Sequence, residues 1–180
     1  MKFDDTNTIK SLGLEKMGFC LLRQGEHSIE YIKDRLIIEI FLDDYSYELS
    51  AFFAMKDISD KVYLQDALDY FNITEYRGTY QLSSLEKLPV GLDYMTDVIG
   101  KVTSYFVEKY EVVFLDIVTW HKATHKKFLE EYYFNTDMEK AERYWKEKEY
   151  GKAKELYEKN GSKLSKLQLK RLKYISREEI

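Results

Sequence analysis

The sequence predicts an α+β fold, in which an antiparallel sheet near the N-terminus is followed by a helical C-terminal half packed on one face of that sheet. Four β-rich runs follow one another with short polar links, and such links favour antiparallel pairing because a parallel crossover needs a dozen residues or more. Later segments repeat apolar residues at three- and four-residue steps, which is typical of amphipathic helices. At 180 residues, the chain is long enough for one domain with a substantial core.

The first expected element is an N-terminal helix. Asn7 or Thr8 can cap it, and Gly18 is expected to end it. Gly13 lies inside this span and lowers its helix propensity. The apolar contacts of this helix would come from Ile9, Leu12, Leu14 and Met17.

A four-stranded antiparallel meander is expected next. Its strands are FCLLRQ, SIEYIK, LIIEIFL and YSYELSAFFAM, and its links are QGEH, KDR and LDDY. Alternation along the last strand places one set of residues on one face: Tyr45, Tyr47, Leu49, Ala51, Phe53 and Met55. The other face carries Ser46, Glu48, Ser50, Phe52 and Ala54. A sheet with one apolar and one partly polar face needs helices over one side only.

The remaining elements are expected to be helical. YLQDALDYF predicts a short helix, and a longer one follows that Ser83 or Ser84 can cap and that Pro89 can delay or kink. The apolar stripe of the longer helix is Leu85, Leu88, Leu92, Met95, Ile99, Val102 and Phe106.

The segment EVVFLDIVTW has strand and helix features together, and we favour a helix from about Asp116. After Asn135, three amphipathic helices are expected, with breaks near Glu149 and at Asn160-Gly161. The whole chain is expected to be a single domain made of three parts: residues 1–80 (helix and sheet), 81–136 (long core helices) and 137–180 (a helical extension).

Charge is distributed unevenly along the chain. From Asp137 onward there are 13 Lys and Arg against 9 Asp and Glu, a balance of +4. Residues 1–136 hold the other 15 Lys and Arg and 23 Asp and Glu, a balance of −8, which gives the formal net charge of −4. Phosphate binding requires a positive face, so we expect no nucleic-acid partner. An acidic body is suited instead to a basic protein partner. The 16 Tyr residues could serve a binding face or pad the outside of the core.

Cellular location is predicted from the cysteine count and the N-terminus. Cys20 is the single cysteine, and its apolar run FCLL predicts a buried, inert thiol. A chain without possible internal disulfides fits a reducing compartment. MKFDDTNTIK is acidic, unlike a signal peptide, and no apolar run reaches the length of a membrane span. We therefore expect a cytoplasmic protein with no membrane partner.

Two carboxylates, Asp43 and Asp44, stand between two apolar runs. An acid–base pair needs carboxylates that converge on a cleft, whereas neighbours at a strand end point to different faces and bond to the local backbone. We interpret the pair as the corner of a β-hairpin.

A metal site is the alternative suggested by WHKATH. His121 and His125 would lie on one helical face, at the spacing that zinc proteases use. Lys122 occupies the place of the catalytic Glu in that motif, and Glu130 or Glu131 lies one turn on. We expect no metal, no cofactor and no catalytic residue, and glycine-rich phosphate loops and the Gly-x-Ser-x-Gly motif are absent from the sequence.

The C-terminal segment from Lys163 to Arg177 has six Lys and Arg and no acid. It could pair with the acidic body, meet an acidic partner, or serve as a solvated face. Upstream of it, Tyr150, Ala153 and Tyr157 resemble the small and aromatic positions of a tetratricopeptide repeat, with Lys148 where that repeat usually carries Gly. One copy predicts the packing of two helices and not a peptide-binding solenoid.

As a whole, the chain resembles uncharacterised bacterial α+β proteins, many of which are suspected immunity proteins of polymorphic toxin systems. The likeness lies in an initial helix ending in GF, in the strand YSYELSAFF, and in a dense charged helix pair at the end. The resemblance implies a non-enzymatic inhibitor that occludes a partner toxin. It assigns a role to no particular residue of this chain. The surface expected to bind the partner is Asp43, Asp44, Tyr45, Tyr47 and Glu48. A small metal-dependent hydrolase using His121 and His125 and a helical adaptor protein are the alternatives.

Overall fold

A computed structural model of the chain describes residues 13–106 and 109–178 and divides into two compact units. Unit 1 ends at Lys122 and unit 2 begins at Ala123, so the boundary falls inside helix α4 (Tyr110–Lys146). Each unit has a hydrophobic cluster of its own. The single domain expected from the sequence stays a prediction.

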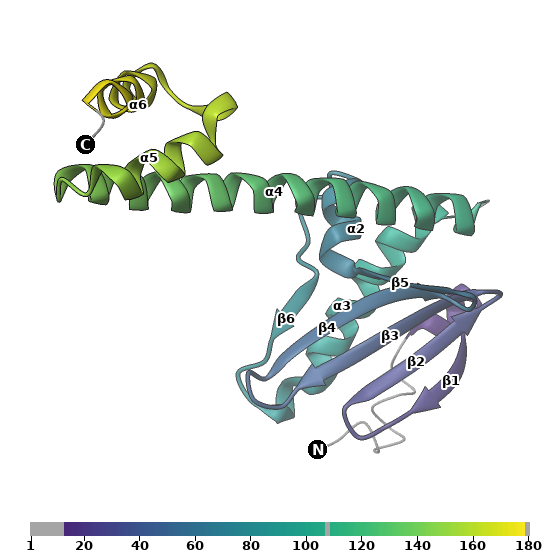
Figure 1. The fold of residues 1–180 in the computed structure, drawn as a ribbon. Helices are drawn as coiled ribbons and strands as arrows, with labels where there is room; N and C mark the ends of the chain where they lie inside the picture. The colour runs from purple at the N-terminus through teal and green to yellow at the C-terminus, as the bar shows by residue number, and fades with distance from the viewer. Residues whose placement is uncertain (1–12, 107–108, 179–180) are drawn as a thin grey trace. The chain divides into compact units, whose positions relative to one another are not determined.

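Unit 1 is built on an antiparallel sheet whose first five strands are adjacent in chain order (Figure 1). The strands are β1 (Cys20–Gln24), β2 (Ser28–Lys33), β3 (Leu36–Asp43), β4 (Glu48–Met55) and β5 (Ile58–Tyr63). A short strand, β6 (Thr79–Gln81), pairs with the first half of β4, while β5 pairs with its second half. The α+β class is confirmed, and the predicted four-stranded meander is corrected to five strands.

The strand β5 is not expected from the sequence, because polar residues interrupt its apolar pattern. Ser59, Asp60 and Lys61 follow one another, and Val62 is the one residue of the strand that is buried. Such a pattern suits a strand at the edge of a sheet, where half of the backbone and most side chains meet solvent. The register of β5 against β4 also shifts between Ala54 and Met55, so strict alternation is lost there.

The expected N-terminal helix is corrected in its described part. Gly13–Met17 forms a short 3-10 helix, η1, and not the end of an α-helix, while residues 7–12 of the prediction lie outside the described residues. Gly18 ends η1, as predicted, with a φ of +85° that favours glycine. The N–H groups of Gly18 and Phe19 donate to the carbonyls of Glu15 and Leu14.

Two helices pack on the inner face of the sheet as expected. They are α2 (Leu64–Tyr70) and α3 (Leu88–Thr103), and the predicted stripe of α3 is buried at Leu88, Leu92, Met95, Ile99 and Val102. A short 3-10 helix, η2 (Leu85–Lys87), precedes α3, and Pro89 lies in the first turn of α3. Ser84 precedes η2 but makes no side-chain capping bond, so the predicted serine cap is wrong.

Helix α4 begins earlier and ends later than predicted. It runs from Tyr110, six residues before the expected start at Asp116, and it continues through Asn135 without a break. The β-branched residues near its start are compatible with a helix because Phe114, Ile117 and Val118 share one helical face and are buried in the unit 1 core. Tertiary packing therefore overrides the strand propensity of EVVF.

The core of unit 1 lies between the inner face of the sheet and the helices (Figure 1). Ile38, Ile40 and Phe53 supply the centre of that face and are fully buried. Gly91 lets α3 approach β4 closely, because a Cβ atom there would lie 2.6 Å from a methyl carbon of Leu49. This packing leaves the other face of the sheet, in the described part of unit 1, without a helix.

The predicted burial of Cys20 is wrong. Cys20 is exposed, because β1 is an edge strand and none of its residues is buried. The preceding Phe19 is buried instead. An apolar run at an edge strand thus contributes one residue to the core and leaves the next ones in solvent.

Unit 2 is a small helical unit formed by the end of α4 with α5 (Tyr150–Lys159), the 3-10 helix η4 (Gly161–Lys163) and α6 (Lys166–Glu178). The predicted breaks near Glu149 and at Asn160-Gly161 are confirmed. The cluster at its centre consists of Met138, Ala141, Ala153, Tyr157 and Ile175.

Asp137 is a buried polar residue that joins α4 to the end of α5. Its Oδ2 accepts a hydrogen bond from Asn160 Nδ2 at 3.0 Å and lies 2.8 Å from Lys159 Nζ. These two partners, Lys159 before Asn160, hold the pKa of Asp137 below its usual value. The carboxylate therefore stays charged and paired inside unit 2.

Three helices end in the same hydrogen-bonding motif, with a left-handed residue after the last turn. Those residues are Gly18 after η1, Asn72 after α2 and Lys148 after α4, with φ values of +85°, +54° and +61°. At the end of α4, the N–H of Lys148 donates to the carbonyl of Trp145, and the N–H of Glu149 donates to the carbonyl of Tyr144. Lysine carries a Cβ that makes this conformation costly, so α4 ends with backbone strain that glycine would relieve.

Tyr31 offers a test of core polarity, because its buried hydroxyl makes no hydrogen bond in the described chain. Burial, with Glu15 nearby, raises the pKa of Tyr31 to about 12. Since an unpaired buried polar group costs about 1–3 kcal/mol, Tyr31→Phe should leave the free energy of unfolding unchanged or raise it by about 1 kcal/mol. Urea unfolding gives the value.

Tyr94→Phe is the control, because Tyr94 exchanges two hydrogen bonds with the Arg77 backbone. This variant should lower the free energy of unfolding by about 1 kcal/mol. Equal losses in both variants would contradict this.

Lys148→Gly tests the strain at the end of α4. We expect the variant to raise the free energy of unfolding of unit 2 by about 1 kcal/mol, because glycine adopts a positive φ without steric cost. Lys140→Gly, at an exposed position inside the C-terminal part of α4, should lower it by about 1 kcal/mol. Thermal unfolding followed by circular dichroism compares the two. A change of the same sign in both variants would show that backbone strain at Lys148 is not the cause.

Candidate functional site

The candidate binding residues lie at the connection between β3 and β4, called here the hairpin corner (residues 43–48). Asp43 is the last residue of β3, and its Oδ1 accepts hydrogen bonds from the N–H groups of Tyr45 at 2.9 Å and Ser46 at 3.3 Å. This is the local backbone bonding expected of a turn aspartate. The interpretation of the two carboxylates as a hairpin corner is therefore confirmed.

Asp44 makes different contacts from Asp43. Its Oδ2 lies 2.9 Å from His27 Nδ1, and the other ring nitrogen of His27 lies 3.5 Å from a carboxylate oxygen of Glu26. The turn between β1 and β2 is thus held beside the hairpin corner by an exposed contact between His27 and Asp44. Asp43 and Asp44 serve separate partners, which is the arrangement of a structural corner and not of two carboxylates sharing one reacting atom.

Tyr45 and Tyr47 belong to the turn and not to β4, which begins at Glu48. The expected strand start at Tyr45 is therefore wrong, although the alternation beyond it holds: Leu49, Ala51, Phe53 and Met55 are all buried. Tyr45 is 98% exposed and Tyr47 is 44% exposed. These two tyrosines therefore do not pack around the outside of the core.

The backbone of the corner is nevertheless well anchored. Tyr47 has a φ of +53°, and its carbonyl accepts hydrogen bonds from the N–H of Leu82 at 2.8 Å and from Gln81 Nε2 at 3.3 Å. Gln81 also bonds to the carbonyl of Ser46. Two exposed tyrosines therefore stand on a turn whose main chain is fixed, which lowers the entropy lost when a partner binds them.

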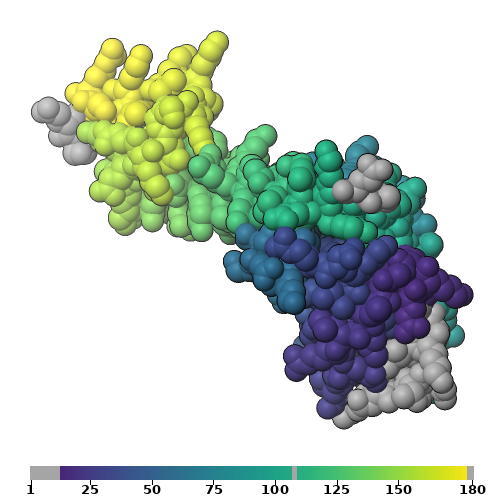
Figure 2. All heavy atoms as spheres, turned by 90° about the vertical axis from the view of Figure 1, so that its right-hand side faces the viewer, coloured from purple at the N-terminus to yellow at the C-terminus, as the bar shows by residue number. Residues whose placement is uncertain are grey.

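The sheet face without a helix, called here the open face, begins at the corner. Residues of the sheet strands, purple to blue in Figure 2, contribute atoms to the surface of unit 1. Glu48 belongs to this face, and strand register adds the other members: Cys20, Arg23, Ser28, Glu30, Ile32, Ile37, Glu39, Phe41, Ser50, Phe52, Ala54, Lys61 and Tyr63.

Aromatic rings occupy the centre of the open face. Phe52 is only 7% exposed, because Phe41 and Tyr63 pack against it with ring centroids at 5.9 and 6.2 Å. The ammonium of Lys61 lies 3.7 Å from the centroid of Phe52, a cation–π contact. The sequence predicts a partly polar face here. The aromatic centre of this face could have been predicted from the central strands, in which apolar residues occupy both the inward and the outward positions.

Two carboxylates face each other across neighbouring strands of the open face. Glu30 and Glu39 are directly opposite, a pairing of like charges that destabilises a sheet. Their nearest cations are Arg23 for Glu30 and Lys61 for Glu39, each at 3.8 Å. With Asp43 and Glu48 at the end of the same face, negative charge exceeds positive charge there.

The histidines of WHKATH make other contacts. His121 Nδ1 lies 3.1 Å from an oxygen of Asp66, which ties α4 to α2 within unit 1. Glu130 lies 3.6 Å from Lys163 Nζ within unit 2. Among residues 13–106 and 109–178, no group of three or more His, Cys, Asp or Glu side chains is placed to hold a metal ion.

The basic C-terminal segment is divided between two faces of α6. Arg171 turns inward, pairs with Glu142 and stacks over Trp145 at 5.1 Å. The outer face exposes Lys166, Lys170, Lys173 and Arg177. No helix within the described ranges is long and apolar enough to cross a bilayer.

Comparison of the chain with protein-family models, curated proteins and solved structures finds no match. Functional inference therefore rests on the hairpin corner and the open face themselves.

Asp43 provides a pH test of the corner. Hydrogen bonds from Tyr45 and then Ser46 lower the pKa of Asp43, so the stability it gives the turn is present above the unfolded pKa and is lost as pH falls through the lower, folded value. In NMR titration, the Asp43 carboxyl should titrate below the usual value of about 3.9, and the amide shifts of Tyr45 and Ser46 should follow with the same midpoint. In Asp43→Asn, those amide shifts should no longer depend on pH in this range. An Asp43 midpoint at or above the usual value would refute the assignment.

Proposed function

We propose that this chain is a non-enzymatic protein-binding module of the immunity type, which occludes a basic partner toxin with the hairpin corner. The observation that carries the proposal is the exposure of Tyr45 and Tyr47 on an anchored turn, beside Asp44 and Glu48. Aromatic anchors supply most of the binding energy of protein interfaces, and tyrosine combines apolar area with a hydrogen-bonding tip.

Charge gives the proposal its partner class. Residues 1–136 carry a balance of −8, and the corner and the open face hold an excess of carboxylates. Opposite charges on a partner would speed association and orient it before the aromatic contacts form. A toxin that acts on nucleic acid needs a positive surface to bind phosphates, and a row of carboxylates can occupy that surface in their place.

The open face extends this binding surface. Its central rings, Phe41, Phe52 and Tyr63, are already packed against one another, so little side-chain entropy would be lost on contact. The opposed Glu30 and Glu39 are unfavourable in the free sheet and would be relieved by a lysine or arginine of a partner. Both features support a rigid acidic surface around an aromatic centre.

A helical adaptor is the second candidate, and one observation favours it. Phe128, Tyr132 and Tyr133 of α4 are each more than half exposed, and the rings of Phe128 and Tyr132 stack with centroids at 6.4 Å. Exposed aromatic residues one turn apart on a helix can dock into a partner's groove. This surface lies in unit 2, so its variants are separable from those of the corner.

Binding to a basic toxin encoded by a neighbouring gene tests the proposal. Tyr45→Ala and Asp44→Lys should each weaken binding roughly tenfold or more, because a buried aromatic anchor or a reversed charge costs about 1.4 kcal/mol or more. Added salt should weaken the wild-type complex further. Isothermal titration calorimetry gives the affinities, and protection of cells that express the toxin gives an independent measure.

Matched controls separate the two candidates. Asp93→Lys introduces the same charge change on an exposed part of α3, and Tyr132→Ala removes an exposed tyrosine from unit 2. Both should leave toxin binding unchanged. Loss of binding in Tyr132→Ala with full binding in Tyr45→Ala would replace the proposal with the adaptor function. Failure to bind the neighbouring toxin, or binding that is insensitive to salt and to Asp44→Lys, would contradict the immunity function.

A further inference from the structure

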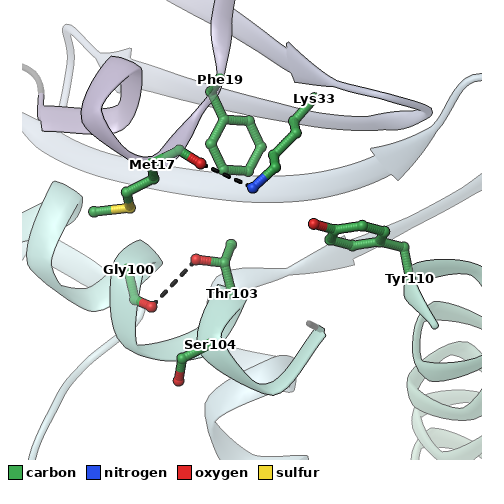
Figure 3. A pocket seen from close by; sticks show the side chains of 7 residues that line it. All are labelled: Met17, Phe19, Lys33, Gly100, Thr103, Ser104 and Tyr110. Carbon is green, nitrogen blue, oxygen red and sulfur yellow. Dashed lines mark hydrogen bonds between the residues drawn. The ribbon is translucent and has the colours of Figure 1, made fainter. Parts of the chain in front are cut away.

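Unit 1 contains a cavity of about 300 Å³ between the sheet and the end of α3 (Figure 3). Met17 and Phe19 line it near η1, Lys33 reaches it from the end of β2, and Thr103 and Tyr110 line it from the helical side. Its volume is at the lower end of the range for small-molecule sites. A space of this size can admit a ligand with a short apolar body.

Lys33 is an unusual residue for its position. In β2, Ile29 and Tyr31 point to the inner face of the sheet and are fully buried, and the next inner position is Lys33, which pairs in register with the buried Leu36. The alternation of the strand therefore directs a charged side chain toward the core side. An ammonium group that loses water is costly unless hydrogen bonds or an opposite charge replace it.

The ammonium of Lys33 is only partly satisfied. It donates one hydrogen bond to the carbonyl of Met17 at 2.9 Å and lies 5.7 Å from the centroid of the Phe19 ring. Within the described chain, no carboxylate forms an ion pair with it, so two of its three N–H groups remain available. Among the described residues, the partners of this ammonium are a neutral carbonyl and a ring face, and neither is a counterion.

A second donor faces the same space. The hydroxyl of Tyr110 points into the cavity (Figure 3) and makes no hydrogen bond to another described residue. The hydroxyl of Thr103 is occupied, because it donates to the carbonyl of Gly100 at 3.2 Å. The hydroxyl of Ser104, which also lines the cavity, donates to the carbonyl of Lys101. Among the described lining side chains, Lys33 and Tyr110 therefore keep donors for a ligand.

We propose that this cavity binds a small monocarboxylate with an apolar body. One carboxylate oxygen accepts from the Lys33 ammonium and the other from the Tyr110 hydroxyl, while the apolar body contacts Met17 and Phe19. Charge-assisted hydrogen bonds of this kind are about twice as strong as neutral ones. This site is separate in residues from the hairpin corner, and its function does not depend on the toxin-binding proposal.

The charge balance of the cavity limits the ligand to a monoanion. A single ammonium can neutralise one negative charge, and the carboxyl end of α3, which includes Gly100 and Thr103, carries the negative end of the helix dipole. A second negative charge on the ligand would lie near that end without a cation. Inorganic phosphate is therefore expected to bind far more weakly than a carboxylate.

Titration of the full chain with benzoate, followed by ¹H–¹⁵N NMR, tests the proposal. We expect saturable shifts at residues lining the cavity, with a dissociation constant below ~1 mM, and no saturation with benzamide, which has the same shape without the charge. Lys33→Met should weaken benzoate binding at least ~10-fold, because a hydrogen-bonded charge is lost while the apolar stem is kept. Tyr110→Phe should weaken it by ~3- to 10-fold for the loss of one neutral donor.

Lys61→Met is the matched control, since Lys61 lies on the open face of the same sheet and makes its own cation–π contact. It should bind benzoate as the wild type does. Lys33→Arg keeps the charge and should retain part of the affinity, which guards against a Lys33→Met variant that fails to fold. Absence of saturation by benzoate, equal binding of benzamide, or full affinity in folded Lys33→Met would each overturn the proposal. If inorganic phosphate bound as tightly as benzoate does, the assignment of the ligand as a monocarboxylate would be wrong.

Discussion

The pairing of β3 with β4 is the constraint on which the rest of unit 1 depends. Eight residue pairs join these strands in unbroken register, from Leu36 opposite Met55 to Asp43 opposite Glu48. Because side chains alternate, a slip of one residue would exchange the inner and outer faces of both strands. The burial of Ile38, Ile40 and Phe53 against the helices prevents that slip, since the alternative would bury Glu39 and expose the isoleucines.

This register also decides where the functional candidates lie. It ends at Asp43 and Glu48, so the tyrosines between them leave the sheet and enter solvent. It places Glu39 opposite Phe52 on β4, and the register of β2 against β3 places the same Glu39 opposite Glu30. On β2, the same alternation delivers Lys33 to the cavity side. One pattern of alternation therefore produces all three features. The corner lies where β3 and β4 end, the open face consists of outward positions, and the charged cavity wall comes from an inward position at the end of β2.

Much of this architecture could be predicted from the sequence, because it rests on strong local periodicity. The stripe of α3, the short helix α2, the strands β2 and β3, and the breaks after Lys146 and Lys159 all follow from apolar spacing or from helix-ending residues. Asp43 could also be assigned correctly, because a turn aspartate bonds to backbone within three residues.

The parts that could not be predicted depend on contacts between distant residues. β5 lacks alternation and is held by β4, and the strand-like start of α4 becomes helical because Phe114 and Ile117 meet the core. The open face needs the register of several strands before Phe41, Phe52 and Tyr63 can be placed together. The cavity around Lys33 joins η1, β2 and the end of α3, which no single stretch of sequence connects.

The exposed position of Cys20 on an edge strand has a practical consequence. The chain has one thiol, and it stands in solvent on β1 at the border of the open face. A maleimide fluorophore or a nitroxide spin label would therefore attach at one defined point without any cysteine having to be removed first. Such a reporter sits next to Ile32 across the strand pair, where its quenching or broadening would register the arrival of any molecule on that surface.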